Sequence, residues 1–369
     1  MKVLHVYKDY PPILGGIENH VQVLAERQAA RGHEVTVLVT NPQGMRTETD
    51  LEHGVRVIRA GRLATVASTP LSAAFAVHLR SQRPEIAHLH FPYPFGDAVH
   101  ALCGRARRTV ITYHSDIVRQ RSLLRFYAPL LRRSLARADG IIAASPRYIQ
   151  TSAFLAPNAA NCTVIPYGID LARFASADPA QVAAIRAQYG TPLILFVGRF
   201  RYYKGLAYLI RAMSRIAGQV VLLGRDTTTR RSELASIAAE SGVLDRVHFV
   251  DGQSADLAAF YHACDLFVLP SIERSEAFGI VQIEAMAAGK AVVCTELGTG
   301  TSYVNQDGVT GRVVPPKDPE ALAAAINELL GDAALLGRMG AAARLRAQTE
   351  FGADVMVNRV LALYENTLS

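Results

Sequence analysis

The chain has 369 residues, of which 50% are hydrophobic and 19% charged, and its formal net charge is +7. It is long enough for two globular domains, and it contains no run of about 18 apolar residues, which excludes a membrane-spanning helix. The four cysteines are scattered without a C-x-x-C pair, so we expect reduced thiols rather than disulfides or zinc ligands.

The first half of the chain predicts strands that alternate with helices. The N-terminus from Met1 to Tyr7 is too short an apolar run for a signal peptide, and we therefore expect a cytoplasmic protein. Residues 2–7 are expected to form a buried first strand. A loop with Gly15-Gly16 leads to a helical pattern over 17–31, and 34–40 is the next strand, as in a parallel α/β sheet. Further strands are expected at 55–59, 86–91, 109–113, 140–144 and 163–166, and helices at 71–81, 97–105, 122–136 and 146–155.

Residues 167–174 break this alternation, and a second series begins after a polar helix at 180–189. Its predicted strands are 193–198, 219–223, 247–250, 266–269 and 291–295, and its helices are 206–216, 231–242, 255–264 and 279–288. The tail is predicted to be helical from Asp318 onward, with Pro319 at the first helical position. We therefore predict two Rossmann-like doubly wound α/β domains, residues 1–170 and 171–350, with a C-terminal helix at 351–369 packed on the first. Ligands of such sheets bind in a cleft at the carboxyl ends of the strands.

Two carboxylates stand eight positions apart in the second half. A loop that enters a helix at Phe278-Gly279 puts Glu276 at the helix start and Glu284 about one and a half turns inside. A helix start offers unpaired N–H groups and a positive dipole end, which suit phosphate or sugar oxygens. A nucleotide sugar fits this pattern, with one acid on the sugar and the other on the ribose. The alternative is two ordinary acids on a helix.

Glycines and cations stand where phosphate would bind. Gly15-Gly16 opens a helix and lets backbone N–H groups approach a phosphate, although a simple turn is the alternative and no G-x-G-x-x-G dinucleotide motif is present. Arg199 and Lys204 follow the strand 193–198, where two cations suit a departing diphosphate. They could instead cap acidic neighbours, but no acid lies within residues 192–221, so we favour the phosphate role.

His114 follows a strand in the first half and is expected to face the cleft, where it could bond a sugar hydroxyl or serve only as a polar cap. The aromatic loop 91–97, with Tyr93 and Phe95, could shape an acceptor pocket or form a packed proline-rich turn. The sequence contains no D-x-D, G-x-S-x-G or P-loop motif. The usual carboxylate pair for a metal on diphosphate is therefore missing, and we predict no metal and no cofactor.

Six arginines and no acid lie between Arg119 and Arg137. Apolar residues alternate with them, which predicts a basic amphipathic helix bent near Pro129. We expect this helix to contact the anionic inner membrane surface, so that the protein is peripheral to the membrane. A solvated helix face is the alternative, and nucleic acid is disfavoured because no aromatic-basic platform accompanies the arginines.

Taken together, these motifs resemble those of the retaining glycosyltransferases of family 4, which have the GT-B fold. The resemblance covers nearly the whole chain and implies that Arg199 and Lys204 neutralise the departing diphosphate, while Glu276 binds sugar hydroxyls and Glu284 binds the ribose. It also implies that His114 contacts the donor sugar and that Gly16 lies against the diphosphate. The expected catalytic residues are His114, Arg199, Lys204 and Glu276. The expected donor-binding residues are Gly15, Gly16, Arg199, Lys204, Glu276, Ala277, Phe278, Gly279, Ile280 and Glu284, and the expected acceptor-binding residues are Tyr93, Phe95 and Asp116.

A closer similarity links residues 91–97, 112–121 and 297–304 to bacterial mannosyl- and rhamnosyltransferases that build lipopolysaccharide O-antigen. It implies a GDP-sugar donor, GDP-mannose or GDP-rhamnose, and a lipid-linked saccharide acceptor. Tyr167 departs from the family, in which this loop usually reads Pro-Asn-Gly. We expect a retaining, metal-independent hexosyltransferase in which the acceptor hydroxyl attacks the face that the nucleotide leaves. The alternatives are a UDP-sugar transferase acting on another acceptor, an epimerase or phosphorylase of the same fold, and a non-catalytic nucleotide-sugar-binding protein; the oligomeric state is not predicted.

Overall fold

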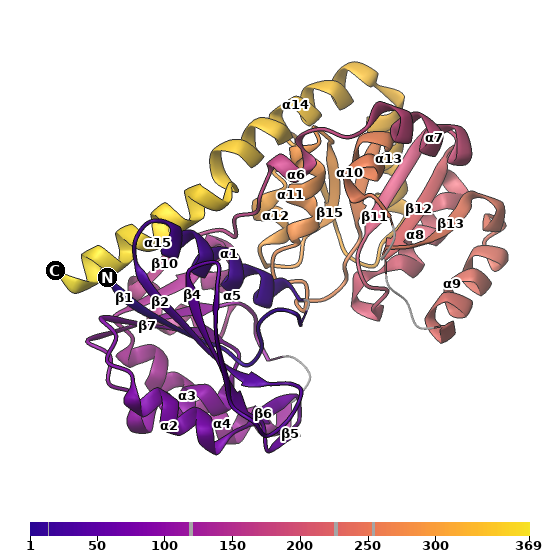
Figure 1. The fold of residues 1–369 in the computed structure, drawn as a ribbon. Helices are drawn as coiled ribbons and strands as arrows, with labels where there is room; N and C mark the ends of the chain where they lie inside the picture. Colours follow the sequence, from indigo (N-terminus) through magenta and orange to yellow (C-terminus); the bar gives the residue numbers. More distant parts are fainter. Residues whose placement is uncertain (14, 118–120, 225–227, 253–254) are drawn as a thin grey trace. The chain divides into compact units, whose positions relative to one another are not determined.

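The computed structural model describes residues 1–13, 15–117, 121–224, 228–252 and 255–369, and it divides the chain into two compact units (Figure 1). Unit 1 contains Met1–Gly168 and Ala353–Ser369, and unit 2 contains Ile169–Gly352. The expected boundary after residue 170 falls two residues beyond the observed one. The C-terminal segment forms helix α15 (Ala353–Leu368), which belongs to unit 1.

Unit 1 is built on an eight-stranded sheet with the order β10-β9-β8-β7-β1-β2-β4-β3, in which only β3 and β4 pair antiparallel. Strand β3 and the small β5–β6 hairpin were not predicted, because β3 is a mostly exposed, charged segment without apolar alternation. The strands are β1 (Lys2–Val6), β2 (Glu34–Asn41), β3 (Glu48–Glu52), β4 (Val55–Gly61), β5 (Ala64–Val66), β6 (Thr69–Leu71), β7 (Ile86–Phe91), β8 (Arg108–Tyr113), β9 (Gly140–Ala143) and β10 (Cys162–Val164).

Helices cover both faces of this sheet. Figure 1 shows α15 beside α1 (Gly16–Ala30) on one face and α2 (Ala73–Ser81), α3 (Pro94–Cys103) and α4 (Arg121–Arg137) on the other. Side chains of α15, such as Val360 and Tyr364, pack in one core cluster with Val3 and Ile86 of the sheet. Full burial of a valine or isoleucine side chain stabilises a fold by about 1.5–3 kcal/mol. The remaining helices of unit 1 are α5 (Pro146–Thr151) and the 3-10 helix η1 (Ala156–Asn161).

The expected loop 91–97 is largely helical. Helix α3 begins at Pro94, whereas the sequence placed its start at Asp97. Pro94 stands in the first turn, where its missing N–H costs no hydrogen bond and its fixed φ suits the helix. The prediction of a loop through Asp97 was therefore wrong, and Phe95 belongs to the helix.

Unit 2 is built on a six-stranded parallel sheet with the order β13-β12-β11-β14-β15-β16. Its helical tail is divided at Asp332, whose side chain accepts a hydrogen bond from the Leu335 N–H and so caps α14. The strands are β11 (Leu193–Val197), β12 (Gln219–Gly224), β13 (Val247–Asp251), β14 (Leu266–Leu269), β15 (Val292–Thr295) and β16 (Gly311–Val314). The helices are α6 (Ala172–Ala175), α7 (Pro179–Tyr189), α8 (Leu206–Ala212), α9 (Thr228–Glu240), α10 (Leu257–Ala263), α11 (Ile280–Ala287), α12 (Thr301–Val304), α13 (Pro319–Gly331) and α14 (Ala333–Glu350), with 3-10 turns η2 (Tyr202–Lys204), η3 (Met213–Arg215) and η4 (Leu244–Arg246).

Each of the two large sheets has a switch point, at which the order of its parallel strands reverses. In unit 1 this switch point lies between β1 and β7, and in unit 2 it lies between β11 and β14. Chain segments that follow the two strands of a switch point diverge to opposite sides, which leaves a crevice at the carboxyl edge where ligands of open α/β sheets bind. The carboxyl edges of these four strands are therefore where functional residues are expected.

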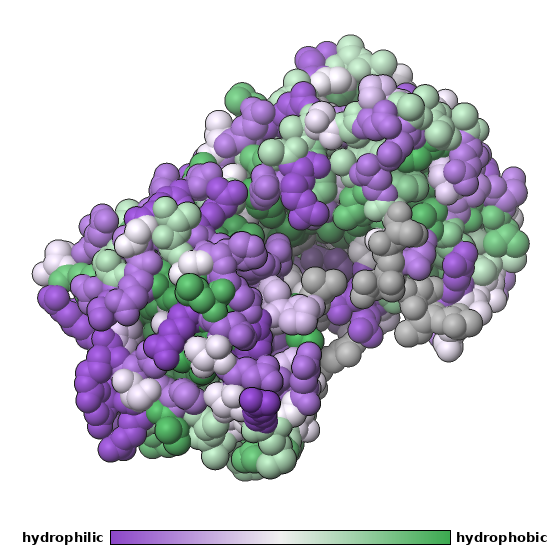
Figure 2. All heavy atoms as spheres, in the orientation of Figure 1, coloured by the Kyte–Doolittle hydropathy of each residue, from purple (hydrophilic) through white to green (hydrophobic). Residues whose placement is uncertain are grey.

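The surface is mixed, and no described helix is both long and apolar enough to cross a membrane. On the face drawn in Figure 2, hydrophilic side chains are interspersed with hydrophobic ones over both units, which is usual for a folded protein. Leu102 and Phe126 are large exposed hydrophobic residues of unit 1, with 87% and 86% of their surface accessible. The four cysteines, all within the described residues, are free thiols.

Candidate active site

Lys204 and Glu276 form a buried ion pair at the switch point of unit 2. Lys204 ends η2, which follows β11, and Glu276 lies in the segment between β14 and α11. The Lys204 Nζ lies 2.5 Å from Glu276 Oε2, and the two side chains are only 11% and 10% exposed. Ser271 Oγ donates a hydrogen bond of 3.0 Å to the same carboxylate oxygen. The sequence singled out both charges but did not predict that they pair.

The backbone around Lys204 depends on a glycine. Gly205 has φ +69°, and a Cβ built on it would lie 1.9 Å from the carbonyl oxygen of Pro270. The Ile272 N–H donates to the Tyr203 carbonyl at 2.7 Å, so the chain after β11 is tied to the chain after β14. Close approach of these two backbones brings Lys204 and Glu276 together.

Arg199, the second predicted cation, is placed differently. It follows β11 and Gly198, whose φ of +148° is available to few side-chain-bearing residues, and its own side chain is exposed. Arg199 thus stands at the same sheet edge as Lys204 but is not buried in an ion pair as Lys204 is.

Helix α11 begins after Gly279, which has φ +81° and whose Cβ would lie 2.6 Å from Gln282 Nε2. Within the described part of the chain no side chain caps this helix, so its first amides are available to an anion. Phe278 is 2% exposed and packs against Phe351, so of this residue only the backbone can serve a ligand. Ala277 accepts a hydrogen bond from the Gly300 N–H, which fixes the loop in front of the helix.

Glu284 lies within α11 and is bonded to a tyrosine. The Tyr261 hydroxyl donates to Glu284 Oε2 at 2.6 Å. Burial raises the pKa of Glu284, and the hydrogen bond from Tyr261 and the charges of Arg173 and Lys204 oppose this shift. Glu284 thus sits deeper in the fold than an ordinary surface acid.

In unit 1, the two glycines of the glycine loop differ in the space beside them. A Cβ on Gly15 would lie 2.1 Å from Glu18 Oε2, whereas a Cβ on Gly16 would meet no atom within 4 Å. Gly16 begins α1 and has open space beside it, which leaves room for the phosphate expected there. Glu18 was not singled out from the sequence, although an acidic residue in the first turn is a signal for a helix start.

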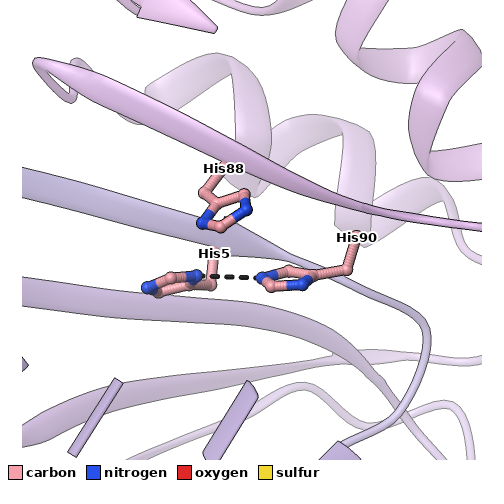
Figure 3. A group of neighbouring side chains, drawn as sticks. All are labelled: His5, His88 and His90. Carbon is pink, nitrogen blue, oxygen red and sulfur yellow. Dashed lines mark hydrogen bonds between the residues drawn. The ribbon is translucent and has the colours of Figure 1, made fainter. Parts of the chain in front are cut away.

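Five histidines are buried together among the described residues of unit 1, and four of them were not singled out from the sequence. Strand β1 carries His5 and β7 carries His88 and His90, while His20 comes from α1 and His114 follows β8. Figure 3 shows His5, His88 and His90 grouped between two strands, with a hydrogen bond between His5 and His90. The available signal was the His-x-His spacing within a predicted buried strand, since residues two apart point to the same face.

Three of these rings form a hydrogen-bonded chain. His5 Nδ1 lies 3.0 Å from His90 Nε2, His90 Nδ1 lies 3.0 Å from His114 Nε2, and His114 Nδ1 lies 2.6 Å from the Tyr167 hydroxyl. Burial lowers the pKa of His5 to about 4 and holds the pKa of His90 and His114 well below the usual value, so the rings are neutral at pH 7. Because both nitrogens of His114 are engaged, its ring can bond a sugar only if one of these bonds opens.

The expected acceptor-binding residues are mostly internal. Tyr93 is 1% exposed and its hydroxyl donates to the Pro70 carbonyl at 3.2 Å, while Phe95 packs against Phe75 and Tyr93. Tyr93 belongs to the core and Phe95 is partly buried against it, as in the packed turn that the sequence left open. Contact of these residues with an acceptor remains a prediction. Asp116 accepts hydrogen bonds from the Tyr113 hydroxyl at 2.9 Å and the Ser152 hydroxyl at 2.8 Å.

Among the residues that the structure describes, two groups of histidines have the spacing that a metal ion needs. The ligand atoms of His5, His88 and His90 lie within 4.8 Å of one another, as do those of His20, His90 and His114. Imidazole nitrogens suit zinc and similar ions. However, the hydrogen bonds of His90 to His5 and His114 occupy both of its nitrogens. The absence of a required metal remains a prediction.

Comparison with known proteins gives the family. The model described as Glycosyltransferase Family 4 matches residues 14–173, and the model described as Glycosyl transferases group 1 matches residues 179–346. The structure superposes on sucrose-phosphate synthase from Thermosynechococcus elongatus with a TM-score of 0.82 and 26% identity, covering 99% of this chain and 98% of that one. This structural similarity and the two Rossmann-like units confirm the predicted GT-B fold.

The chain belongs to glycosyltransferase family 4 and is a glycosyltransferase. It is 37% identical over 371 residues to the O-antigen chain mannosyltransferase C of Escherichia coli, covering 100% of this chain and 99% of that protein. It is 38% identical over 360 residues to the D-rhamnosyltransferase WbpZ of Pseudomonas aeruginosa, covering 96% of this chain and 93% of that protein.

Proposed function

We propose that the protein transfers a mannose or rhamnose from a GDP-sugar to a lipid-linked saccharide in the assembly of lipopolysaccharide O-antigen. The similarity over the whole chain to enzymes named for O-antigen mannosyl transfer and D-rhamnosyl transfer supports the sugar and the pathway. The transfer retains the anomeric configuration and needs no metal. The alternative is a UDP-sugar donor with another acceptor.

The observation that carries this proposal is the buried Lys204–Glu276 pair at the carboxyl edge of β11 and β14. An ammonium group has three N–H donors, so Lys204 can hold Glu276 and still bond a phosphate oxygen. Charge builds on the diphosphate as it leaves, and a preorganised cation in a partly dry site stabilises that charge. Arg199, exposed at the same edge, supplies the second positive charge.

Glu276 is arranged to bind the donor sugar. Within the described part of the chain, the hydrogen bonds of its carboxylate go to Oε2, from Lys204 and Ser271. Oε1 is then left to accept from a sugar hydroxyl, and the uncapped start of α11 follows three residues later in the chain. Glu284 is proposed to bind the ribose, while Gly15, Gly16 and His114 keep their expected donor contacts as predictions.

Thermal stabilisation by a panel of GDP-, UDP- and dTDP-sugars tests the donor. A ligand present at 100 times its dissociation constant stabilises the folded protein by about 2.7 kcal/mol. GDP-mannose or GDP-rhamnose is expected to raise the melting temperature at micromolar concentration, and the Glu284→Gln protein should need more of it. Stabilisation by UDP-sugars alone would contradict the proposed donor.

We also propose that α4 contacts the anionic surface of the inner membrane. Its residues Arg125, Arg133 and Arg137 are exposed, and Arg133 and Arg137 also line a cavity of about 550 Å³ between α3 and α4 whose other lining residues are apolar or uncharged polar. Arg119, the first residue of the predicted basic segment, lies outside the described residues. Each arginine near an anionic surface contributes about 1 kcal/mol.

Co-sedimentation with vesicles tests this contact. Replacing Arg125, Arg133 and Arg137 by alanine is expected to weaken binding to vesicles containing anionic lipid on the order of 100-fold. Equal binding of the parent protein to neutral and anionic vesicles would contradict the electrostatic contact.

A further inference from the structure

The histidine chain of unit 1 ends on a buried glutamine. Gln28 of α1 is fully buried, and its Oε1 lies 2.8 Å from His5 Nε2. Its Nε2 lies 3.5 Å from the hydroxyl of Tyr364 on α15, which is 2.5 Å from His88 Nδ1. His88 Nε2 is in turn 2.6 Å from Thr112 Oγ1. Two hydrogen-bonded branches therefore start from one side-chain amide.

The direction of every bond in the longer branch follows from the amide. An amide oxygen can only accept, so His5 must carry its proton on Nε2. A neutral imidazole has one donor and one acceptor nitrogen, so His5 Nδ1 accepts from His90 Nε2–H, and His90 Nδ1 accepts from His114 Nε2–H. His114 Nδ1 is then an acceptor, and the Tyr167 hydroxyl donates to it.

A reversed amide would reverse all of these bonds. With the Gln28 nitrogen facing His5, the protons of His5, His90 and His114 would all move to Nδ1, and Tyr167 would become the acceptor. A hydroxyl group or a neutral imidazole can donate on one side and accept on the other in either sense, so it does not fix the direction of the hydrogen bonds. The amide of Gln28 has one end that only donates and one end that only accepts. Of the groups that form these two branches, Gln28 is thus the one that determines the proton order, that is, whether His5, His90 and His114 carry their protons on Nε2 or on Nδ1.

We propose that Gln28 is a positioning residue for sugar transfer, and that it acts through His5 and His90 to set which ring nitrogen of His114 carries the proton. The effect on transfer rests on the proposed function, in which His114 contacts the donor sugar, but the proton order itself does not. The His114 ring is packed in a group of five buried rings, which keeps it from turning over. It stacks on the ring of Tyr167, for example, at a centroid distance of 5.6 Å. The chain therefore supplies a fixed tautomer and a fixed ring orientation.

Nitrogen NMR of protein labelled with ¹⁵N-histidine tests the proton order. The full-length protein is expected to show Nε2–H tautomers for His5, His90 and His114 at neutral pH. The Gln28→Leu protein should show mixed tautomers at His114. Gln22→Leu, on the same helix but with its side chain bonded to Glu26 rather than to a histidine, should leave the spectrum unchanged. Nδ1–H at any of the three rings of the parent protein, or an unchanged His114 in Gln28→Leu, would overturn the proposal.

A second variant keeps the test decisive if Gln28→Leu does not fold. In Tyr167→Phe, His114 should keep its proton on Nε2, because His90 still accepts it. A shift of the proton to Nδ1 would show that Tyr167 rather than Gln28 sets the tautomer and would overturn the proposal. Metal analysis gives a further test. The proposal would also be overturned if each chain held one zinc ion tightly and if removing that ion changed the histidine signals.

Kinetics then separate positioning from structure. Gln28→Leu is expected to lower kcat roughly tenfold with little change in the KM for the donor, and Gln22→Leu to match the parent protein. Altered His114 tautomers with unchanged kcat would overturn the positioning role. If the parent protein transfers no sugar at all, the proposed function fails, and the NMR result still decides the proton order.

Discussion

Replacing Lys204 by alanine is expected to lower the rate of sugar transfer by roughly 100- to 1,000-fold, the usual cost of losing one preorganised group that stabilises transition-state charge. Lys204 lies in a site where its side chain is 11% exposed, so bulk water does not screen its charge fully. The loss should fall mainly on kcat, because the diphosphate gains charge as the bond to the sugar breaks. Steady-state transfer from the donor sugar measures it.

Stability must be separated from catalysis in this experiment. Without Lys204, the carboxylate of Glu276 is buried and unpaired, which costs about 3–5 kcal/mol of unfolding free energy. The double variant Lys204→Met, Glu276→Gln removes both charges and should recover most of this stability while remaining inactive. Lys290→Ala is a matched control in the same unit, since Lys290 bonds only the His262 carbonyl among the described residues. Near-normal turnover in Lys204→Ala would contradict the proposal that Lys204 stabilises the departing diphosphate.

Gly205→Ala is expected to destabilise the protein by about 2–5 kcal/mol and to abolish most transfer. The positive φ of Gly205 costs a residue with a Cβ about 1–2 kcal/mol, and the contact of 1.9 Å with the Pro270 oxygen adds an overpacking cost of about 1–3 kcal/mol. The backbones that carry Lys204 and Ser271 would have to separate. Denaturant unfolding gives the free energy and the donor assay gives the effect on transfer.

Gly242→Ala isolates the steric part of this effect. Gly242 has φ +68°, nearly that of Gly205, but its Cβ would meet nothing within 4 Å. It should therefore lose only the conformational cost, about 1–2 kcal/mol, and remain active. Equal loss of stability in both variants would contradict the claim that Gly205 is required because a Cβ would contact the Pro270 carbonyl oxygen.

Periodicity alone predicted the two doubly wound sheets, because buried parallel strands are continuous apolar runs and the helices between them have a 3.6-residue pattern. Strand β3 escaped prediction because its pairing with β4 uses exposed charged residues. The early start of α3 escaped because Pro92 and Pro94 were taken as signals of a loop, although proline is favoured in the first turn of a helix.

The candidate site was predicted in part. Local signals identified Lys204 and Glu276 separately, but their ion pair joins residues 72 positions apart and depends on the close backbone contact at Gly205. The histidine chain escaped because His5 lies in β1, His90 lies in β7 and His114 follows β8, and only the sheet order places them side by side. For Tyr93 the sequence left an acceptor pocket and a packed turn open, because an aromatic side chain suits both, and its burial appears only in the structure.

The anomeric configuration of the product tests the central claim most directly. The protein is incubated with GDP-mannose or GDP-rhamnose and a lipid-linked saccharide acceptor in the presence of EDTA, and the new glycosidic bond is analysed by NMR couplings. We predict that transfer proceeds with the metal chelated and that the product keeps the anomeric configuration of the donor. An inverted product, or transfer that requires a divalent metal ion, would contradict the proposed retaining, metal-independent mechanism.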